Sequence, residues 1–473
     1  MVADANVSPL TIARINARID RLTAPGVGRL VFALLGICYF WAFYDLSMTG
    51  FTLPVIIRDL HLTQLLTSLV VSLNLVGYMV GSYLLATIGD AFGRRRALQI
   101  CMIILAGSAL LSGLAWDAAS LIAFRFLVGV GVGAQIALAS SYLGELSPAQ
   151  MRGRFVSYSA LWGGVALAAA PFIALALVGV PHLGWRILFA LGVLAALVLP
   201  FYQQRWLPES PRWLVLHRRT EDAERIVASM EQRARSVTGA ELPPVPEEPS
   251  ERPGQRFPTL ELLRRPYVIS LLVVFAYWFL NYFNTYAVVA YRPIVLQHFG
   301  FTLANSLQLI AISSISFVVS YLLNLLILDR VERKTWILLG AGLTACSYLV
   351  MALTRANPIA YILSTFIAGC VGNGALIVAG YIYTLEIFPT RARASAMGLA
   401  DGLGHVGGVV QSFVVLYVLT AVGVVATVYL FAAVGAVMML LILVMGRATT
   451  GRPLTELAGD ARPGEVAPTM GET

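Results

Sequence analysis

The chain has 473 residues, of which 58% are hydrophobic and 12% are charged, and its mean hydropathy is +0.78. A soluble domain would carry about 25% charged residues, and a disordered chain would be poor in apolar residues, so the composition excludes both classes. The net charge is +8, and only the placement of the basic residues can show whether it serves a nucleic-acid partner. The four cysteines all lie inside apolar segments, so the sequence implies no disulfide framework.

Apolar segments long enough to cross a bilayer recur along the chain. A spanning helix needs roughly 20 predominantly apolar residues. The predicted spans are 29–57, 66–88, 97–116, 118–143, 156–180, 185–204, 267–297, 303–328, 335–354, 357–384, 394–420 and 423–446. We therefore predict an all-α polytopic membrane protein with twelve transmembrane helices, arranged as one six-helix bundle at 29–204 and a second at 267–446.

Three segments lie outside these predicted bundles. Residues 1–28 are polar and rich in arginine, and we expect a short amphipathic lead-in there rather than a signal peptide. Residues 205–266 join the bundles, with a mixed-charge helix at 209–235, a Pro- and Glu-rich stretch after it and a short helix at 259–265. We expect residues 447–473 to form a disordered tail.

Basic residues concentrate in the even-numbered connections between spans. The connection after the second span contains Arg94, Arg95 and Arg96, and the connections after the fourth, eighth and tenth spans are also basic. The positive-inside rule then places both termini and all even-numbered connections in the cytoplasm. Membrane topology therefore accounts for the net positive charge, and we expect no nucleic-acid partner.

The two halves repeat the same motifs at similar offsets. GDAFGRRR (89–96) corresponds to LDRVERKT (328–335), and ELSPAQMRGR (145–154) corresponds to EIFPTRARAS (386–395). Such a duplication is typical of secondary transporters, whose site lies between the halves. Acids beside arginines at helix ends can hold neighbouring helices together and gate one mouth, although the arginines could also serve topology alone. The predicted gating residues are Asp90, Arg94, Glu145, Arg152, Asp329, Arg333, Glu386 and Arg393.

One acid and one arginine lie well inside predicted spans. Asp45 is in the first span and Arg125 in the fourth, both in the outer half of the bilayer. Ionisable groups inside a membrane are costly and usually functional, so we expect the two side chains to face each other. We predict a proton-coupling pair, with a static salt bridge as the alternative.

These motifs, with RFLVGVGVG (125–133) and PESPRWL (208–214), resemble the major facilitator superfamily over residues 29–446. PESPRWL is typical of the branch that contains sugar porters, organic ion transporters and bacterial metabolite–proton symporters. The resemblance implies proton-coupled transport by alternating access. The sequence departs from the family at Glu332, which replaces a glycine, and span ten has no counterpart of Arg125.

Polar and aromatic residues inside the spans are candidates for solute binding, although each could instead form an interhelical hydrogen bond. They are Tyr44, Asn74, Trp162, Asn281, Tyr282, Asn284, Tyr286, Asn373, His405 and Gln411, with Tyr78 and Thr285 beside them. The glutamines that sugar porters typically carry on spans five and seven are absent. The candidates therefore suit a small, flat, partly apolar solute with one or two polar groups.

We expect proton-coupled uptake of a nicotinate-like aromatic or other organic acid across a bacterial inner membrane. The expected partners of this monomer are the solute, the proton and the lipid bilayer. An organic cation or sugar transporter, a proton-coupled exporter and a non-transporting receptor are the alternatives. No HExxH, GxSxG or P-loop spacing occurs and the histidines are scattered, so we expect no enzyme, no cofactor and no metal site.

The sequence alone does not show how an anion would be held. Arg125 is the only arginine that we place well inside a span, and Arg292 is one of the few arginines near the odd-numbered connections. His405 could bind a carboxylate when it is protonated. We expect Asp401 to form a structural ion pair with the basic segment that begins at Arg391, with a proton site as the alternative.

Overall fold

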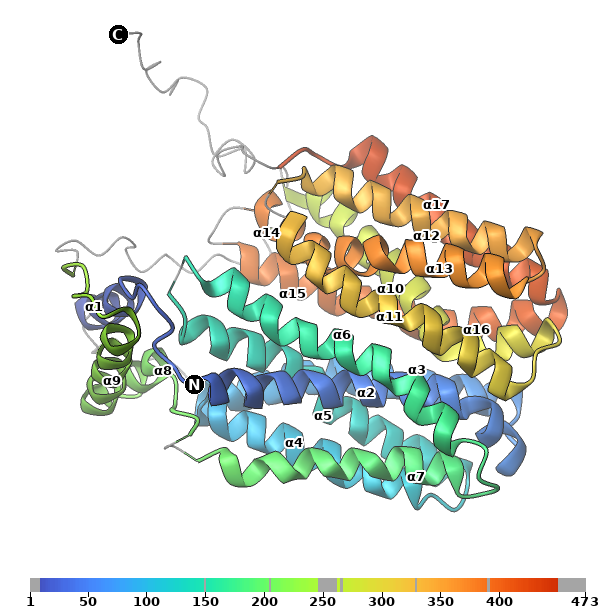
Figure 1. The fold of residues 1–473 in the computed structure, drawn as a ribbon, viewed down its shortest axis with the longest axis horizontal. Coiled ribbons are helices and arrows are strands. Elements are labelled where there is room, and N and C mark those ends of the chain that lie inside the picture. Colours follow the sequence, from blue (N-terminus) through green and yellow to red (C-terminus); the bar gives the residue numbers. More distant parts are fainter. Residues whose placement is uncertain are drawn as a thin grey trace, which may run out of the picture.

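The protein is built from long helices that run side by side (Figure 1). The computed structural model describes residues 9–148, 150–203, 206–245, 262–263, 267–327, 330–388 and 392–449, and every regular element within them is helical. Within these ranges, twelve helical segments are long and apolar enough to cross a membrane, which confirms the predicted fold class. They are α2 (Arg29–Asp59), α3 (Gln64–Phe92), α4 (Arg94–Gly113), α5 (Ala118–Glu145), α6 (Arg152–Leu177), α7 with η1 (Gly184–Ala190, Leu191–Phe201), α10 (Tyr267–His298), α11 (Leu303–Ile327), α12 (Arg333–Leu353), α13 with η3 and α14 (Pro358–Asn373, Gly374–Ala379, Gly380–Ile387), α15 with α16 (Arg393–Gly404, Val406–Ala421) and α17 (Val424–Met445).

The outer surface of these helices is apolar. Large side chains such as Leu326, Leu363 and Val444 are more than half exposed, at 67%, 57% and 71%. A soluble protein rarely leaves so many large apolar side chains in water, whereas lipid tails solvate them without cost. The chain is a multi-pass membrane protein.

The twelve segments form two groups that meet along three helix pairs. Segments α2 to η1 lie together on one side of the molecule, and α10 to α17 lie together on the other (Figure 1). Between the groups, α2 packs on α10, α3 on α16 and α6 on α11. The hydroxyl of Ser68 donates to the carbonyl of Ser412 across the second pair at 2.9 Å, and Ser314 donates to Ala168 across the third at 3.2 Å.

The two groups share a hydrophobic core at only one end. Near that end, which we call the far end, Met48 and Phe51 of α2 and Trp185 pack in one cluster with Ile294 and Leu419 of the second group. At the opposite end, which we call the linker end, the first group has its own core together with α1, α8 and α9. The core of the second group contains one buried residue of the first group, Leu75, among the described residues. The halves are therefore joined at the far end and packed separately at the linker end.

Segment α13–η3–α14 is interrupted by a wider, π-helical turn at Gly374–Ala379. The amide of Gly374 donates to the hydroxyl of Ser320 at 2.8 Å, and the side chain of Asn324 fills the space where a Cβ of Gly374 would lie. An amide bonded to a side chain of α11 breaks the regular α-helical ladder, and such turns are frequent at functional sites.

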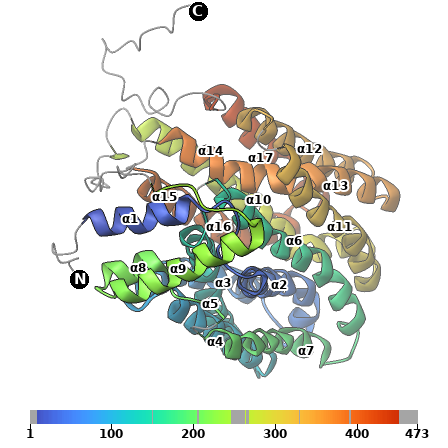
Figure 2. The same cartoon turned by 60° about the vertical axis from the view of Figure 1, so that its left-hand side comes forward.

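Three helices outside the spans lie together at the linker end (Figure 2). They are α1 (Pro9–Asp20), α8 (Pro211–Leu216) and α9 (Thr220–Thr238). Ile15 and Ile19 of α1 are buried in the same core as Val227 of α9. Arg18 donates to Glu231 through two bonds of 2.9 and 2.8 Å, and it also pairs with Glu224. The lead-in is therefore a docked helix, and the 209–235 helix divides into α8 and α9.

The ion pairs between α1 and α9 make this docking sensitive to acid. Burial alone would raise the pKa of Glu231, but hydrogen bonds and positive charge from Arg18 and Arg21 outweigh it and lower the pKa to about 2. A carboxylate with a depressed pKa stabilises the folded state fully above its usual value of 4.5 and loses this contribution as the pH falls toward 2.

We therefore expect Glu231→Gln to reduce amide protection of α1 at neutral pH. Lowering the pH from 5 to 3 should do the same in the wild type and have little further effect in the variant. Hydrogen-exchange protection factors of α1 measure both effects. Glu241→Gln is the control, because Glu241 is 89% exposed in its pair with Arg235. Unchanged protection of α1 in Glu231→Gln would contradict this account.

Candidate functional site

A buried ion pair lies inside the first group of helices. Arg125 of α5 donates to both carboxylate oxygens of Asp45 of α2, through Nη1 at 2.8 Å and Nη2 at 2.7 Å. Arg125 is fully buried and Asp45 is 3% exposed. The two side chains therefore face each other across the bundle, in a bidentate geometry that is the strongest form of this contact.

The surroundings of this pair supply few other polar groups. Nη2 of Arg125 also donates to the hydroxyl of Thr49 at 2.8 Å, and its guanidinium lies 4.8 Å from the centre of the Phe189 ring. Nε of Arg125 is buried without a hydrogen-bond partner among the described residues. The charge on the arginine therefore depends mainly on Asp45 for compensation.

The glycines that follow Arg125 explain why α5 lies so close to α3. A Cβ on Gly129 would come within 2.0 Å of the carbonyl of Asn74, and one on Gly133 within 2.0 Å of the carbonyl of Tyr78. Small residues four positions apart let two membrane helices touch along their backbones. The close approach brings the amide of Asn74 within 2.8 Å of the carbonyl of Arg125, where it donates a hydrogen bond.

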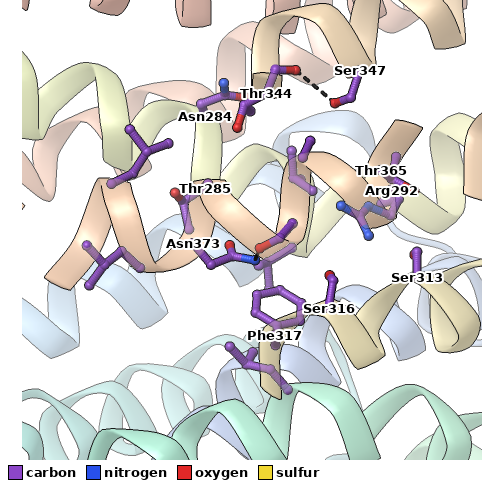
Figure 3. A pocket seen from close by; sticks show the side chains of 18 of the residues that line it. Asn284, Thr285, Arg292, Ser313, Ser316, Phe317, Thr344, Ser347, Thr365 and Asn373 are labelled. Atoms are coloured by element: carbon purple, nitrogen blue, oxygen red, sulfur yellow. Dashed lines mark hydrogen bonds between the residues drawn. The ribbon is translucent and has the colours of Figure 1, made fainter. Parts of the chain in front are cut away.

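A cavity of about 100 Å³ lies mainly among α10, α11, α12 and α13 (Figure 3). Its polar wall includes three candidates from the sequence, Asn281, Asn284 and Asn373, together with Thr285. Phe43 and Leu46 of α2 and Leu167 of α6 complete the wall from the other group. The cavity is thus bounded by both halves of the molecule, and Leu46 directly follows Asp45 in the chain.

The remaining candidates from span seven face away from this cavity. Tyr282 and Tyr286 pack with His405 of the break between α15 and α16, with ring centres 3.9 and 5.9 Å from the imidazole. Tyr78 of α3 stacks on His405 from the opposite group, at 4.6 Å. These residues form an aromatic cluster next to the cavity and are not among the residues that line it.

The other sequence candidates make contacts within the helix bundle. The Tyr44 hydroxyl donates to the carbonyl of Leu188 at 3.0 Å, and the Asn74 amide is bonded as described above. Trp162 packs against Gly36, and the Gln411 amide donates to Ser412 at 3.2 Å. Tyr44, Asn74 and Trp162 therefore make contacts between helices, whereas the hydrogen bond of Gln411 lies within α16.

Arg292 is a cavity residue that was not among the sequence candidates for solute binding. This residue lies inside α10, six positions before its last residue, and its side chain lines the cavity. A signal for it exists in the sequence. Residues 281, 284, 285, 288 and 292 all line the cavity, and this spacing is that of one face of an α-helix. Following that face from Asn281 would have identified the arginine.

The carboxylate of Asp401 has two phenol partners that the sequence did not indicate. It accepts hydrogen bonds from Tyr282 and from Tyr381, the latter at 3.2 Å. Arg391, which suggested an ion pair, lies outside the described residues. Within the described part of the chain, the carboxylate is held by phenol hydroxyls.

We expect Asp401→Asn to lower stability and to leave proton coupling intact. An amide accepts less strongly than a carboxylate, and hydrogen bonds to a charged group are worth about 1.5–3 kcal/mol. The thermal unfolding midpoint and proton-driven accumulation measure the two effects, with Tyr381→Phe as the matched control for loss of one hydrogen bond. Loss of accumulation in a folded Asp401→Asn protein would instead make Asp401 a proton site.

A charged cluster ties helix ends together at the linker end. Arg94 donates to Asp90 at 2.6 Å and to Glu145 through two bonds of 3.2 and 3.1 Å, so it joins α3, α4 and α5. Glu209 of the PESPRWL segment accepts from the backbone amides of Arg94 and Arg95 at 2.9 and 3.3 Å. Glu209 therefore caps α4. The sequence interpretation identified its motif but assigned it no role.

The second half has a simpler version of this cluster. Arg333 lies 3.4 Å from Glu386, as its place in the repeat suggested. Glu332, at the position of the usual glycine, has a φ of −57° and caps α12 with its own side chain. A negative φ suits any residue, so the departure from the family pattern creates no strain. Asp329 and the side chains of Arg152 and Arg393 lie outside what the structure describes.

Comparison with known proteins agrees with this architecture. The inward-open xylose transporter XylE of Escherichia coli superimposes with a TM-score of 0.69 at 20% identity, over 90% of this chain and 98% of that one. The niacin transporter NiaP of Acinetobacter baylyi is 25% identical over 93% of this chain and 99% of its own length. The 4-hydroxybenzoate transporter PcaK of the same organism is 26% identical over 80% of this chain and 82% of its own.

The family assignment follows from a match over most of the chain. The model of the sugar (and other) transporter family matches residues 40–460. Members of this family are transporters, which agrees with the absence of catalytic motifs from the sequence. The chain belongs to the sugar (and other) transporter family, in the sugar porter branch of the major facilitator superfamily.

Proposed function

We propose that this secondary transporter takes up a small aromatic or other organic acid together with a proton, by alternating access. The observation that carries the proposal is the buried Asp45–Arg125 pair. An acid in such a place can bind a proton only by giving up its charge-assisted bonds. Proton binding then leaves Arg125 with little compensation in an apolar interior, which is an unfavourable state that a rearrangement of the helices can relieve.

Helix α2 connects this proton site to the cavity. Asp45 binds Arg125, whereas Phe43 and Leu46 of the same helical turn line the cavity. A shift of α2 that follows protonation therefore moves the wall that the first half contributes. In the proposed cycle, protonation from outside releases Arg125 and permits closure over the solute, and proton loss to the cytoplasm restores the pair.

The placement of the cores fits one step of this cycle. The positive-inside rule assigns the linker end to the cytoplasm of a bacterial cell. The halves share a core at the far end and pack separately at the linker end, as expected for a conformation that faces inward. The names of two relatives, for niacin and 4-hydroxybenzoate, support an aromatic acid as the solute.

A sugar is the second candidate, because hydroxyl side chains line the cavity. However, Ser313, Ser347 and Thr365 each donate to a carbonyl of their own helix, at 3.0, 2.8 and 2.6 Å. Those hydroxyls can accept hydrogen bonds but have no free donor for a sugar oxygen. An organic cation fits less well, since the described lining residues include no acid.

Two measurements test the proposal. A thermal-shift screen of the purified protein compares aromatic acids, sugars and organic cations, and a ligand at 100 times its Kd should add about 2.7 kcal/mol of stability. Uptake into vesicles with an imposed pH gradient then tests coupling. We expect stabilisation by acids and accumulation driven by an inward proton gradient. Accumulation of the solute that does not depend on the pH gradient would overturn the proposal. Export of the solute driven by that gradient would overturn it as well.

A further inference from the structure

Arg292 is the one charged side chain among the described residues that line the cavity. It is half-buried, about 9 Å from the end of α10. The hydroxyls of Tyr348 and Tyr361 lie close to it, and none of the lining residues is an acid. A guanidinium has five N–H donors, so several remain for a ligand even if both hydroxyls accept one.

Two buried amides in the same wall have polar atoms without partners. Asn284 is 4% exposed, and neither its Nδ2 nor its Oδ1 has a hydrogen-bond partner within the described part of the chain. Nδ2 of Asn281, which is 1% exposed, has none either. Unpartnered buried polar atoms are rare because each costs about 1–3 kcal/mol. Their place on the cavity wall, on the helical face that also carries Arg292, points to a ligand with polar groups (Figure 3).

The rest of the wall is suited to an apolar body. Phe43, Leu46 and Leu167 contribute from the first half, and Val288 and Phe317 contribute from the second. An apolar body between such side chains is held by burial, while the few polar groups set its orientation. A free sugar would leave hydroxyl groups against these surfaces, and each buried hydroxyl without a partner is costly.

We infer that Arg292 binds the carboxylate of the transported solute. The amides of Asn281 and Asn284 then bind a second polar group of the solute, and the apolar wall holds its ring or chain. The substrate class is a small monocarboxylate with a flat or short apolar body and one further hydrogen-bonding group. This assignment rests on the proposed transport function and gives it a recognition residue. A guanidinium binds a carboxylate through two parallel hydrogen bonds, which an ammonium cannot reproduce.

The test compares acids with their uncharged amides on the purified full chain. The probes are nicotinate and benzoate, paired with nicotinamide and benzamide, which keep the ring and remove the charge. We expect the wild type to bind the acids and not the amides. Arg292→Gln should weaken acid binding about tenfold or more, equivalent to about 1.4 kcal/mol, and should abolish the preference for acid over amide. Arg292→Lys should keep part of the preference.

Two further variants keep the outcome interpretable. Arg58→Gln is the control, because Arg58 is an exposed arginine in the last turn of α2 and does not line the cavity. Asn284→Asp places a negative charge in the cavity, so it should repel the acids. It provides a second test of the site if Arg292→Gln fails to fold. The inference is overturned if no acid binds the wild type, or if the acids bind Arg292→Gln and Asn284→Asp as they bind the wild type.

Failure of this inference is separable from failure of the transport proposal. Proton-driven accumulation of a sugar or a cation by the wild type, with no binding of either acid, would overturn the role of Arg292 and leave coupled transport in place. Acid binding that depends on Arg292, without any proton-driven accumulation, would support the recognition site and overturn coupled uptake.

Discussion

Asp45→Asn should abolish accumulation of the solute against its gradient while binding and exchange of the solute continue. Asparagine has nearly the shape of aspartate, and its oxygen can still accept one bond from Arg125, but it cannot take up or release a proton. The ratio of internal to external solute should fall to about one under an imposed pH gradient, because a carrier without coupling only equilibrates its solute. Solute exchange across the same vesicles measures the activity that remains.

Stability needs its own control in this experiment. Loss of one partner from a buried ion pair costs about 3–5 kcal/mol, so the thermal midpoint should fall as well. Asp59→Asn is the matched variant, because Asp59 ends the same helix and accepts from the indole of Trp185 at 2.8 Å. We expect it to accumulate solute like the wild type. If Asp45→Asn concentrates solute as the wild type does, Asp45 is not the coupling site and its pair with Arg125 is structural.

Asp90→Asn should slow transport strongly while expression and folding stay near normal. The Asp90 side chain is 75% exposed, and an exposed pair such as Asp90–Arg94 contributes only about 0–1 kcal/mol to stability. The pair should contribute more to the stability of the conformation in which the linker end is closed, because water is then excluded from its surroundings. Initial uptake rates should fall about tenfold, which corresponds to about 1.4 kcal/mol in the barrier.

Two companion variants separate gating from topology and from folding. Arg96→Gln removes an exposed charge from the same basic run, and it should transport at the wild-type rate if that residue only sets topology. Glu145→Gln should lower the thermal midpoint, because Glu145 is only 13% exposed in its pair with Arg94. Wild-type uptake by Asp90→Asn would remove the gating role of this cluster.

The spans could be predicted from the sequence because a bilayer imposes a minimum apolar length. The motifs at Asp90 and Glu145 and their counterparts at Asp329 and Glu386 also revealed the duplication. Depth along a helix follows from residue counting, so the sequence placed Asp45 and Arg125 at similar depth. Their contact could then be expected, since either charge alone would be costly inside the bundle.

Rotation of each helix about its axis was harder to predict. Asn281 and Asn284 of α10 face the cavity, whereas Tyr282 and Tyr286 of the same turns face His405. The prediction that these residues act as one unit came from the density of polar residues along the span, which says nothing of their angular positions. The same omission hid Arg292, and caps such as Glu209 depend on tertiary contacts that periodicity does not encode.

The docking of α1 and α9 also determines where the polypeptide can be divided. Both helices share a core with the first six spans, so the part of the chain that keeps its packing partners runs from residue 9 to residue 245. The sequence had placed the end of the first six-helix bundle at residue 204. Two fragments separated between residues 246 and 261 would each retain their own core. Co-expressed fragments cut there should reassemble into a working carrier, whereas a cut near residue 205 would detach Glu209 from the helix that it caps.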